Sequence, residues 1–236
     1  QGIPHHLLDV ANPKRKFTVS QYQKLALSTI KKIHNKGKIP FLVGGSGFYI
    51  KSIVDGIIIP EVKPDWKLRK KLERKSNKDL YKMLFKIDWE RAKSIDKNNP
   101  RRLIRALEIV LKTKKPITKL VTEKQFDVLQ IGVNKSQNEI KKLINARLLK
   151  RLKKGMISEV KKLRESGLSF KRLEELGLEY RFVAQYLQKK ITYQEMVDNL
   201  KKEIEHFVKR QMTWFKRNNR IKWIKNYRES EKLVKI

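Results

Sequence analysis

The feature that most limits the fold is a change of apolar periodicity between residues 17 and 54. Apolar side chains recur every three or four positions across residues 17–36, which predicts an amphipathic helix capped by Thr18 or Ser20. The run Ile39–Val43 predicts a short buried strand, followed by a glycine-rich turn and a second helix to about Val54. A helix, a strand, a turn and a helix in this order predict an α/β fold with a parallel sheet.

The remaining residues show mainly helical periodicity after a proline-bounded connection at residues 59–65. We expect helices at about residues 65–75, 77–85, 88–95 and 100–113, a helical block at 136–189 and a long helix at 192–217. Further strands are predicted at residues 127–133 and 221–224. No run of apolar residues is long enough for a transmembrane helix, so we expect no membrane partner.

The chain is strongly basic. It contains 58 Lys and Arg residues against 24 Asp and Glu residues, a formal net charge of +34. Because such a charge repels itself unless a polyanion is near, nucleic acid is the leading partner. Codon bias is an alternative source of the many lysines, but it explains the clustered arginines less well. The absence of cysteine excludes disulfides, thiol catalysis and Cys-ligated zinc, and it fits the cytoplasm.

The turn Gly44-Gly45-Ser46-Gly47 has two possible roles. A P-loop requires G-x-x-x-x-G-K-[ST], and this motif occurs nowhere in the chain. The structural alternative is a tight strand-to-helix turn with Ser46 as its N-cap, which the spacing alone favours. The functional alternative is a helix N-terminus whose amides bind an anion or a polar substrate.

A second candidate site is the predicted helix in NNPRRLIRALEIVLK, residues 98–112. Arg101, Arg105 and Glu108 share one of its faces. Three arginines within five residues favour an anionic ligand, because the planar guanidinium fork matches phosphates and base edges. The alternative is a solvated face that carries a weak Arg105–Glu108 ion pair.

The predicted C-terminal helix mixes basic and aromatic residues in FVKRQMTWFKRNNRIKW, residues 207–223. Aromatic side chains among cations can stack on unpaired bases. We assign Trp214 and Phe215 to the core instead, because they lie near the apolar stripe of the helix. Lys209 and Arg210 are predicted to contact an RNA backbone.

Seven motifs, taken in their order, resemble the tRNA dimethylallyltransferases, also called tRNA isopentenyltransferases. The motifs are PHHLLDV, FTVSQY, GKIPFLVGGSGFYIKSI, NNPRRLIRALEIV, GMISEVKKL, LGLEYR and KRQMTWFKR. They span nearly the whole chain, and the ordered set is far more specific than any single member.

The resemblance implies transfer of a dimethylallyl group from dimethylallyl diphosphate to N6 of an adenosine. That adenosine lies 3′ of the anticodon in tRNAs reading codons that begin with U, and it is flipped out to reach the donor. The implied fold is a P-loop NTPase-like α/β core with a parallel sheet, a mainly helical insertion and C-terminal helices. The implied partners of this cytoplasmic, monomeric protein are the tRNA anticodon stem-loop and the diphosphate, with Mg²⁺ held by ligands outside this chain.

The resemblance also implies a set of tRNA contacts. Ser46 stands where the family usually has Thr, which places the turn Gly44, Gly45, Ser46 and Gly47 against the RNA. Arg69 and the segment Arg101–Arg105 match family residues beside the RNA, although Arg101 replaces a Gln. Tyr180 and Arg181 match a family Gly-Tyr-Lys/Arg motif, with extra residues in GLEYR. The expected tRNA-binding residues are Ser46, Arg69, Arg101, Arg102, Arg105, Tyr180, Arg181, Lys209 and Arg210.

One part of the family pattern is absent from these residues. The family has a P-loop and a general-base Asp ahead of its PHHLLD motif, so we expect both upstream of Gln1. We interpret residues 1–60 as part of the α/β core, 61–125 as the helical insertion with tRNA contacts, and 126–236 as the remaining core strand and C-terminal helices. We expect such a fragment to bind tRNA without transferring the group. The alternatives are a natural non-catalytic RNA-binding protein and a relative of small-molecule P-loop kinases.

Overall fold

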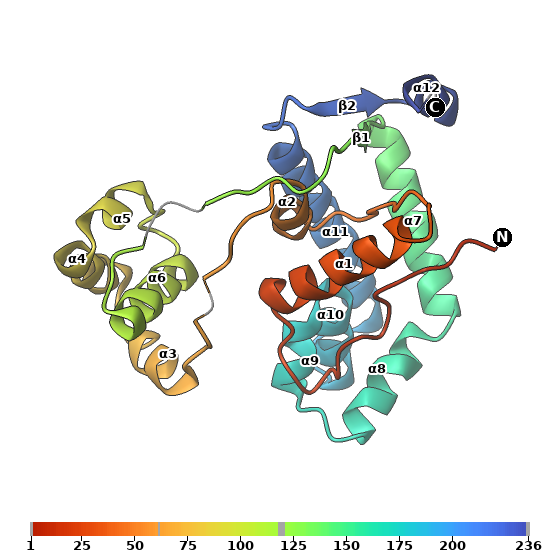
Figure 1. Ribbon diagram of the computed structural model, residues 1–236. Coiled ribbons are helices and arrows are strands. Elements are labelled where there is room, and N and C mark those ends of the chain that lie inside the picture. Colours follow the sequence, from red (N-terminus) through yellow and green to blue (C-terminus); the bar gives the residue numbers. More distant parts are fainter. Residues whose placement is uncertain (1, 61, 118–120, 235–236) are drawn as a thin grey trace. The chain divides into compact units, whose positions relative to one another are not determined.

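The computed structural model describes residues 2–60, 62–117 and 121–234, which form two compact units (Figure 1). Unit 1 comprises Gln1–Val54 and Phe126–Ile236, and unit 2 comprises Asp55–Gln125. Unit 2 is thus inserted between two segments that fold together as unit 1. Within the described residues, no helix combines the length and the apolar character needed to cross a membrane.

The described part of unit 2 is built from short helices with side-chain caps. The helices are α3 (Trp66–Leu72), α4 (Asn77–Ile87), α5 (Trp89–Ser94) and α6 (Pro100–Thr113). Each N-terminus is capped by an Asp, Ser or Asn side chain that accepts a backbone N–H, which satisfies an otherwise unpaired donor. Leu80 and Leu84 of α4 are fully buried in the same cluster as Leu103 and Leu107 of α6.

The two ends of unit 2 are hydrogen-bonded to each other. Ile57 and Thr122 form an antiparallel bridge. The Glu123 amide donates to the Gly56 carbonyl at 3.0 Å, and the Ile58 amide donates to the Val121 carbonyl at 2.9 Å. Gly56 has φ +58°, and a Cβ there would lie 1.7 Å from the Glu123 carbonyl oxygen, so only glycine fits.

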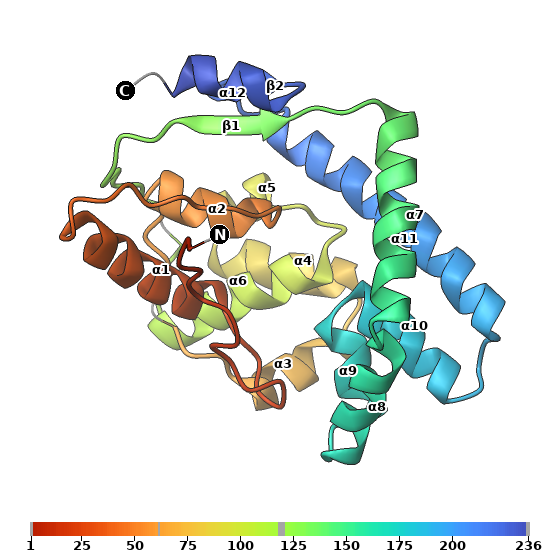
Figure 2. The ribbon, with the colours of Figure 1, turned by 90° about the vertical axis from the view of Figure 1, so that its right-hand side faces the viewer.

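Unit 1 is mostly helical, as Figure 2 shows from the side. Its helices are α1 (Val19–His34), α2 (Gly47–Val54), α7 (Gln137–Lys153), α8 (Met156–Glu165), α9 (Phe170–Leu176), α10 (Leu178–Leu187), α11 (Tyr193–Phe215) and α12 (Tyr227–Leu233). Thr18 caps α1 in a capping box with Gln21, which confirms the first of the two predicted caps. The core lies among α7 to α11, where Leu173, Val183 and Met196 are fully buried.

The sheet of unit 1 contains two described strands, β1 (Gln130–Val133) and β2 (Ile221–Ile224). They are parallel, with Gln130 opposite Ile221 and Val133 opposite Ile224, which confirms the predicted parallel sheet and the predicted bounds of β2. β1 is three residues shorter at its start than predicted. Helix α12 had no counterpart among the predicted elements.

The predicted buried strand at Ile39–Val43 is wrong. These residues do not form a strand, and Phe41 and Val43 are 79% and 89% exposed. A strand needs a neighbour for its backbone groups, and no segment among the described residues pairs with this run. Apolar composition signals the tendency to enter a sheet, but it does not supply the partner strand.

Candidate functional site

The glycine-rich turn packs against helix α11. The Gln211 side-chain amide donates a 2.8 Å hydrogen bond to the Gly45 carbonyl across 166 positions of sequence. A Cβ at Gly45 would lie 2.1 Å from the Gln211 nitrogen. A side chain at Gly45 would therefore require the Gln211 amide to move and would disturb its bond to the Gly45 carbonyl.

Gly47, the first residue of α2, makes a second close contact with the same helix. A Cβ at this position would lie 2.2 Å from the indole nitrogen of Trp214. Gly44, by contrast, has no atom within 4 Å of a Cβ added there. The turn thus seats α2 on α11 through two of its three glycines, and this contact joins two motifs from opposite ends of unit 1.

The side chains beside this contact face solvent. Ser46 is exposed, and no described hydrogen bond involves its hydroxyl, so the predicted N-cap bond is not formed. Lys209 and Arg210 are exposed and immediately precede Gln211 in helix α11. The Arg210 guanidinium lies 5.9 Å from the Phe207 ring centroid. The arrangement brings a free hydroxyl and two cations to the elements that meet at the turn.

The assignment of Trp214 to the core is wrong, because the residue is 37% exposed. Phe215 is only partly buried. The buried residues of α11 lie near its start, at Met196, Val197 and Leu200. Apolar residues recur at helical spacing along all of α11, but only those near its start are buried in the core.

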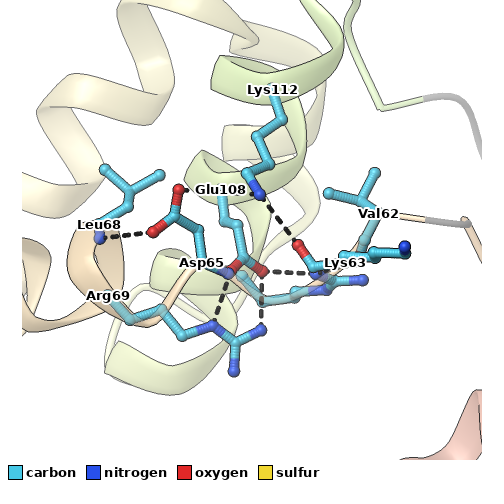
Figure 3. Close-up of polar contacts among 8 residues, drawn as sticks. Val62, Lys63, Asp65, Leu68, Arg69, Glu108 and Lys112 are labelled. Atoms are coloured by element: carbon cyan, nitrogen blue, oxygen red, sulfur yellow. Dashed lines mark hydrogen bonds and ion pairs between the residues drawn. The ribbon is translucent and has the colours of Figure 1, made fainter.

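In unit 2, the main polar cluster centres on Glu108 of α6 (Figure 3). Its carboxylate is completely buried and accepts from Arg69 Nε at 2.9 Å, Arg69 Nη2 at 2.7 Å and Arg105 Nη1 at 2.5 Å. The Asp65 amide donates a further 2.6 Å bond. Arg105 also donates to the Val62 carbonyl at 3.1 Å. The predicted solvated Arg105–Glu108 pair is therefore a buried pair shared with Arg69.

The pKa of Glu108 reflects this environment. Burial opposes ionisation, but hydrogen bonds from Arg69, the Asp65 amide and Arg105 outweigh it and lower the pKa of Glu108 from 4.5 to about 2. Glu108 is therefore ionised at neutral pH, and it cancels one of the two arginine charges.

Acid is expected to destabilise unit 2 through Glu108. Because the folded pKa lies below the unfolded value, this stabilisation is complete above pH 4.5 and is lost as the pH falls toward 2. The shift corresponds to about 3 kcal/mol. Hydrogen exchange of the α6 amides between about pH 5 and 3 measures the effect, and Glu108→Gln should show a weaker pH dependence. An equal dependence in both proteins would refute this assignment.

The remaining predicted residues belong to α6 of unit 2 and α10 of unit 1. Arg101 and Arg102 of α6 are exposed, and no described ion pair involves either. Arg181 is exposed in the first turn of α10. The Tyr180 hydroxyl donates to Glu159, and burial together with this bond raises the pKa of Tyr180 to about 12. Tyr180 is thus engaged with α8, a partner that its sequence motif did not indicate.

The structure brings two sets of the predicted tRNA-binding residues together, one in each unit. Gly45 and Gly47 contact the helix that carries Lys209 and Arg210, all in unit 1. Arg69 and Arg105 meet at Glu108 in unit 2. The sequence did not reveal that Glu108 connects Arg69 to Arg105. The only indication was the position of this acidic residue three places after Arg105.

A metal site is not evident in these units. Among the described residues, no three His, Asp or Glu side chains gather closely enough to hold an ion.

Comparison with known proteins shows which family the chain belongs to. Residues 1–218 match the model of the IPP transferase family. A tRNA dimethylallyltransferase from Carboxydothermus hydrogenoformans is 39% identical over 240 residues, covering 98% of this chain and 76% of the relative. The chain belongs to the IPP transferase family. A second member, from Acetivibrio thermocellus, is 35% identical and aligns with 100% of the chain and 79% of its own length.

Solved structures agree with this family assignment. The full-length tRNA isopentenylpyrophosphate transferase from Bacillus halodurans superposes with a TM-score of 0.68 at 30% identity, over 99% of this chain and 76% of that one. A eukaryotic dimethylallyltransferase acting on tRNA gives a TM-score of 0.73 at 22% identity, over 91% and 56% of the two chains, and shows the fold alone. The mixed α/β fold predicted for the IPP transferase family is confirmed.

Proposed function

We propose that this chain provides the tRNA-binding part of an enzyme that transfers a dimethylallyl group from dimethylallyl diphosphate to tRNA. The acceptor is N6 of the adenosine 3′ of the anticodon in tRNAs that read codons beginning with U. Membership in a prenyltransferase family carries the proposal. The contact of the glycine-rich turn with α11 supports it, because this contact sets the exposed Ser46 beside a basic, aromatic helix.

The chemistry requires accurate placement of the acceptor. The N6 amine is a weak nucleophile, because its lone pair is delocalised into the adenine ring. Its attack on the allylic carbon forms the C–N bond as the C–O bond to diphosphate breaks, and a base or water then takes one proton from the amine. Holding the amine in line with that carbon lowers the barrier, since orientation is fixed before reaction. We assign this role of holding the tRNA to Ser46, Lys209 and Arg210 in unit 1, and to the α6 arginines in unit 2.

The proposal includes further tRNA contacts, a cofactor, a cellular compartment and an oligomeric state. Arg69, Arg101, Arg102, Arg105, Tyr180 and Arg181 remain proposed tRNA contacts, and Mg²⁺ remains a proposed cofactor for the leaving diphosphate. We place the reaction in the cytoplasm, where the tRNA substrate is found, and propose that the protein acts as a monomer.

The product of the complete gene provides the test. It is incubated with labelled dimethylallyl diphosphate and an anticodon stem-loop, and incorporation of label into RNA is measured. Label is expected in the stem-loop with adenosine 3′ of the anticodon and not in one with guanosine there. Equal binding of this stem-loop and an unrelated hairpin, without any label transfer, would favour a non-catalytic RNA-binding protein instead.

Arg105→Ala is expected to weaken tRNA binding about tenfold or more, because a charge-assisted contact is lost. Binding of the donor diphosphate by the complete gene product should be nearly unchanged. Calorimetric titration with each ligand measures both effects. Arg74→Ala is the control, since Arg74 is exposed in the same unit and no described ion pair involves it. A loss confined to the donor contradicts the assignment of Arg105 to RNA.

A further inference from the structure

Glu108 organises two arginines from different helices into one rigid group. Its oxygen Oε1 accepts from the Asp65 amide and Arg69 Nε, and its oxygen Oε2 accepts from Arg69 Nη2 and Arg105 Nη1. These four bonds fill the acceptor capacity of a carboxylate. Glu108 has no surface of its own to offer a ligand, because it is completely buried.

The arginines, in contrast, still face outward. The Arg69 and Arg105 side chains are 24% and 33% exposed, respectively. Arg69 uses Nε and one hydrogen of Nη2 for Glu108, and Arg105 uses Nη1 for Glu108 and the Val62 carbonyl. No described hydrogen bond involves the other N–H groups of either guanidinium. Two positive charges and one negative charge leave the group with a net charge of +1 at neutral pH.

Neighbouring residues strengthen this arrangement. The Arg69 guanidinium lies 5.0 Å from the centroid of the Trp66 ring, which fixes its plane from one side. The exposed Arg101 precedes Arg105 by one helical turn of α6 and adds a second cation on that helix. A planar, pre-oriented guanidinium loses little conformational freedom when it binds an oxyanion.

We propose that Glu108 is a positioning residue that holds Arg69 and Arg105 as one fork for a phosphate of the RNA backbone. This inference rests on the proposed function, since it takes tRNA to be the ligand. A buried ion pair is by itself weak evidence for a stabilising role, because an apolar pair of similar shape often stabilises a fold as well. The partly exposed guanidinium groups give the buried carboxylate a use that an apolar pair lacks.

The first test changes the shape of the fork and keeps its charge. Arg69→Lys retains the cation but loses the planar pair of bonds to Glu108. We expect it to weaken binding of the anticodon stem-loop by about tenfold. Arg74→Lys is the matched control, and it should alter the dissociation constant less than about twofold. Equal affinities in the two variants would overturn the proposal.

The second test uses the sign of a charge change. Glu108→Gln and Glu90→Gln each make unit 2 more positive by one charge, and Glu90 is exposed on α5. Attraction between charges alone predicts tighter RNA binding by both variants. The positioning role predicts weaker binding by Glu108→Gln only, with a shallower salt dependence by about one phosphate contact. Circular dichroism verifies the fold, and if Glu108→Gln unfolds, the Arg69→Lys comparison decides.

The outcomes separate this inference from the proposed function. If the wild-type chain binds all RNA hairpins equally and Arg69→Lys still loses affinity, the positioning role holds and tRNA selectivity fails. If the wild type selects the anticodon stem-loop and neither Arg69→Lys nor Glu108→Gln loses affinity, the positioning role fails and the proposed function remains. Absence of any RNA binding by the wild type overturns both.

Discussion

Raising the monovalent salt concentration from roughly 50 to 200 mM is expected to weaken tRNA binding by this chain about 10³-fold or more. Each phosphate contact releases condensed counterions, so the affinity falls steeply with salt when many contacts form. The chain has a net charge of +34, and Arg101, Arg102, Arg181, Lys209 and Arg210 are all exposed. Filter binding or fluorescence anisotropy across a salt series measures the slope.

Two controls accompany this measurement. Thermal unfolding at each salt concentration shows that the protein stays folded, and an unrelated hairpin separates general attraction from recognition of the anticodon stem-loop. A decrease of less than about tenfold is incompatible with an extensive phosphate interface. In that case the lysine content reflects codon usage more than RNA contact.

Gly47→Ala is expected to lower the rate of prenyl transfer by the complete gene product about 100-fold. The added Cβ would lie 2.2 Å from the Trp214 ring, so the ring or the start of α2 must move by more than 1 Å to reach an ordinary contact. A displacement of this size at an orienting element costs about two orders of magnitude in rate. Single-turnover kinetics at saturating tRNA measures the effect.

Gly44→Ala is the matched control in the same turn. A Cβ at Gly44 meets no protein atom within 4 Å, so the variant should leave the packing of α2 on α11 unchanged. Tryptophan fluorescence should change in Gly47→Ala and stay constant in Gly44→Ala. Equal rates in the two variants would show that the contact between α2 and α11 does not orient the substrate.

Local signals predicted the helices of both units well. The caps at Thr18 and Asn99 each satisfy a backbone donor within three residues, so the information lies in a short stretch of sequence. The strand Ile221–Ile224 was likewise predicted with the bounds that the structure shows. Pattern reasoning works where the partner of a group is a near neighbour in the chain.

Contacts between residues far apart in the sequence could not be predicted in this way. The prediction of a buried strand at Ile39–Val43 failed because a strand depends on a neighbour that the run itself does not specify. The glycines at 45 and 47 marked a close approach, but their partners Gln211 and Trp214 lie more than 160 positions away.

Glu108 shows the same limit for a buried charge. Its spacing from Arg105 indicated a helical ion pair, which is usually weak and exposed. Its burial follows from Arg69 and the Asp65 amide, which come from a segment about 40 positions earlier. Neither the carboxylate nor the arginine has a sequence signature that predicts this meeting.

The hydrogen-bonded ends of unit 2 have a consequence for how this protein can vary. Because Gly56 and Glu123 are joined at the point where the chain enters and leaves the unit, the span between the two ends is independent of what lies between them. Insertions or deletions within the helices of unit 2 can therefore accumulate without changing the spacing that unit 1 experiences. The bonded ends therefore allow the length of unit 2 to change while its two points of attachment to unit 1 stay the same distance apart.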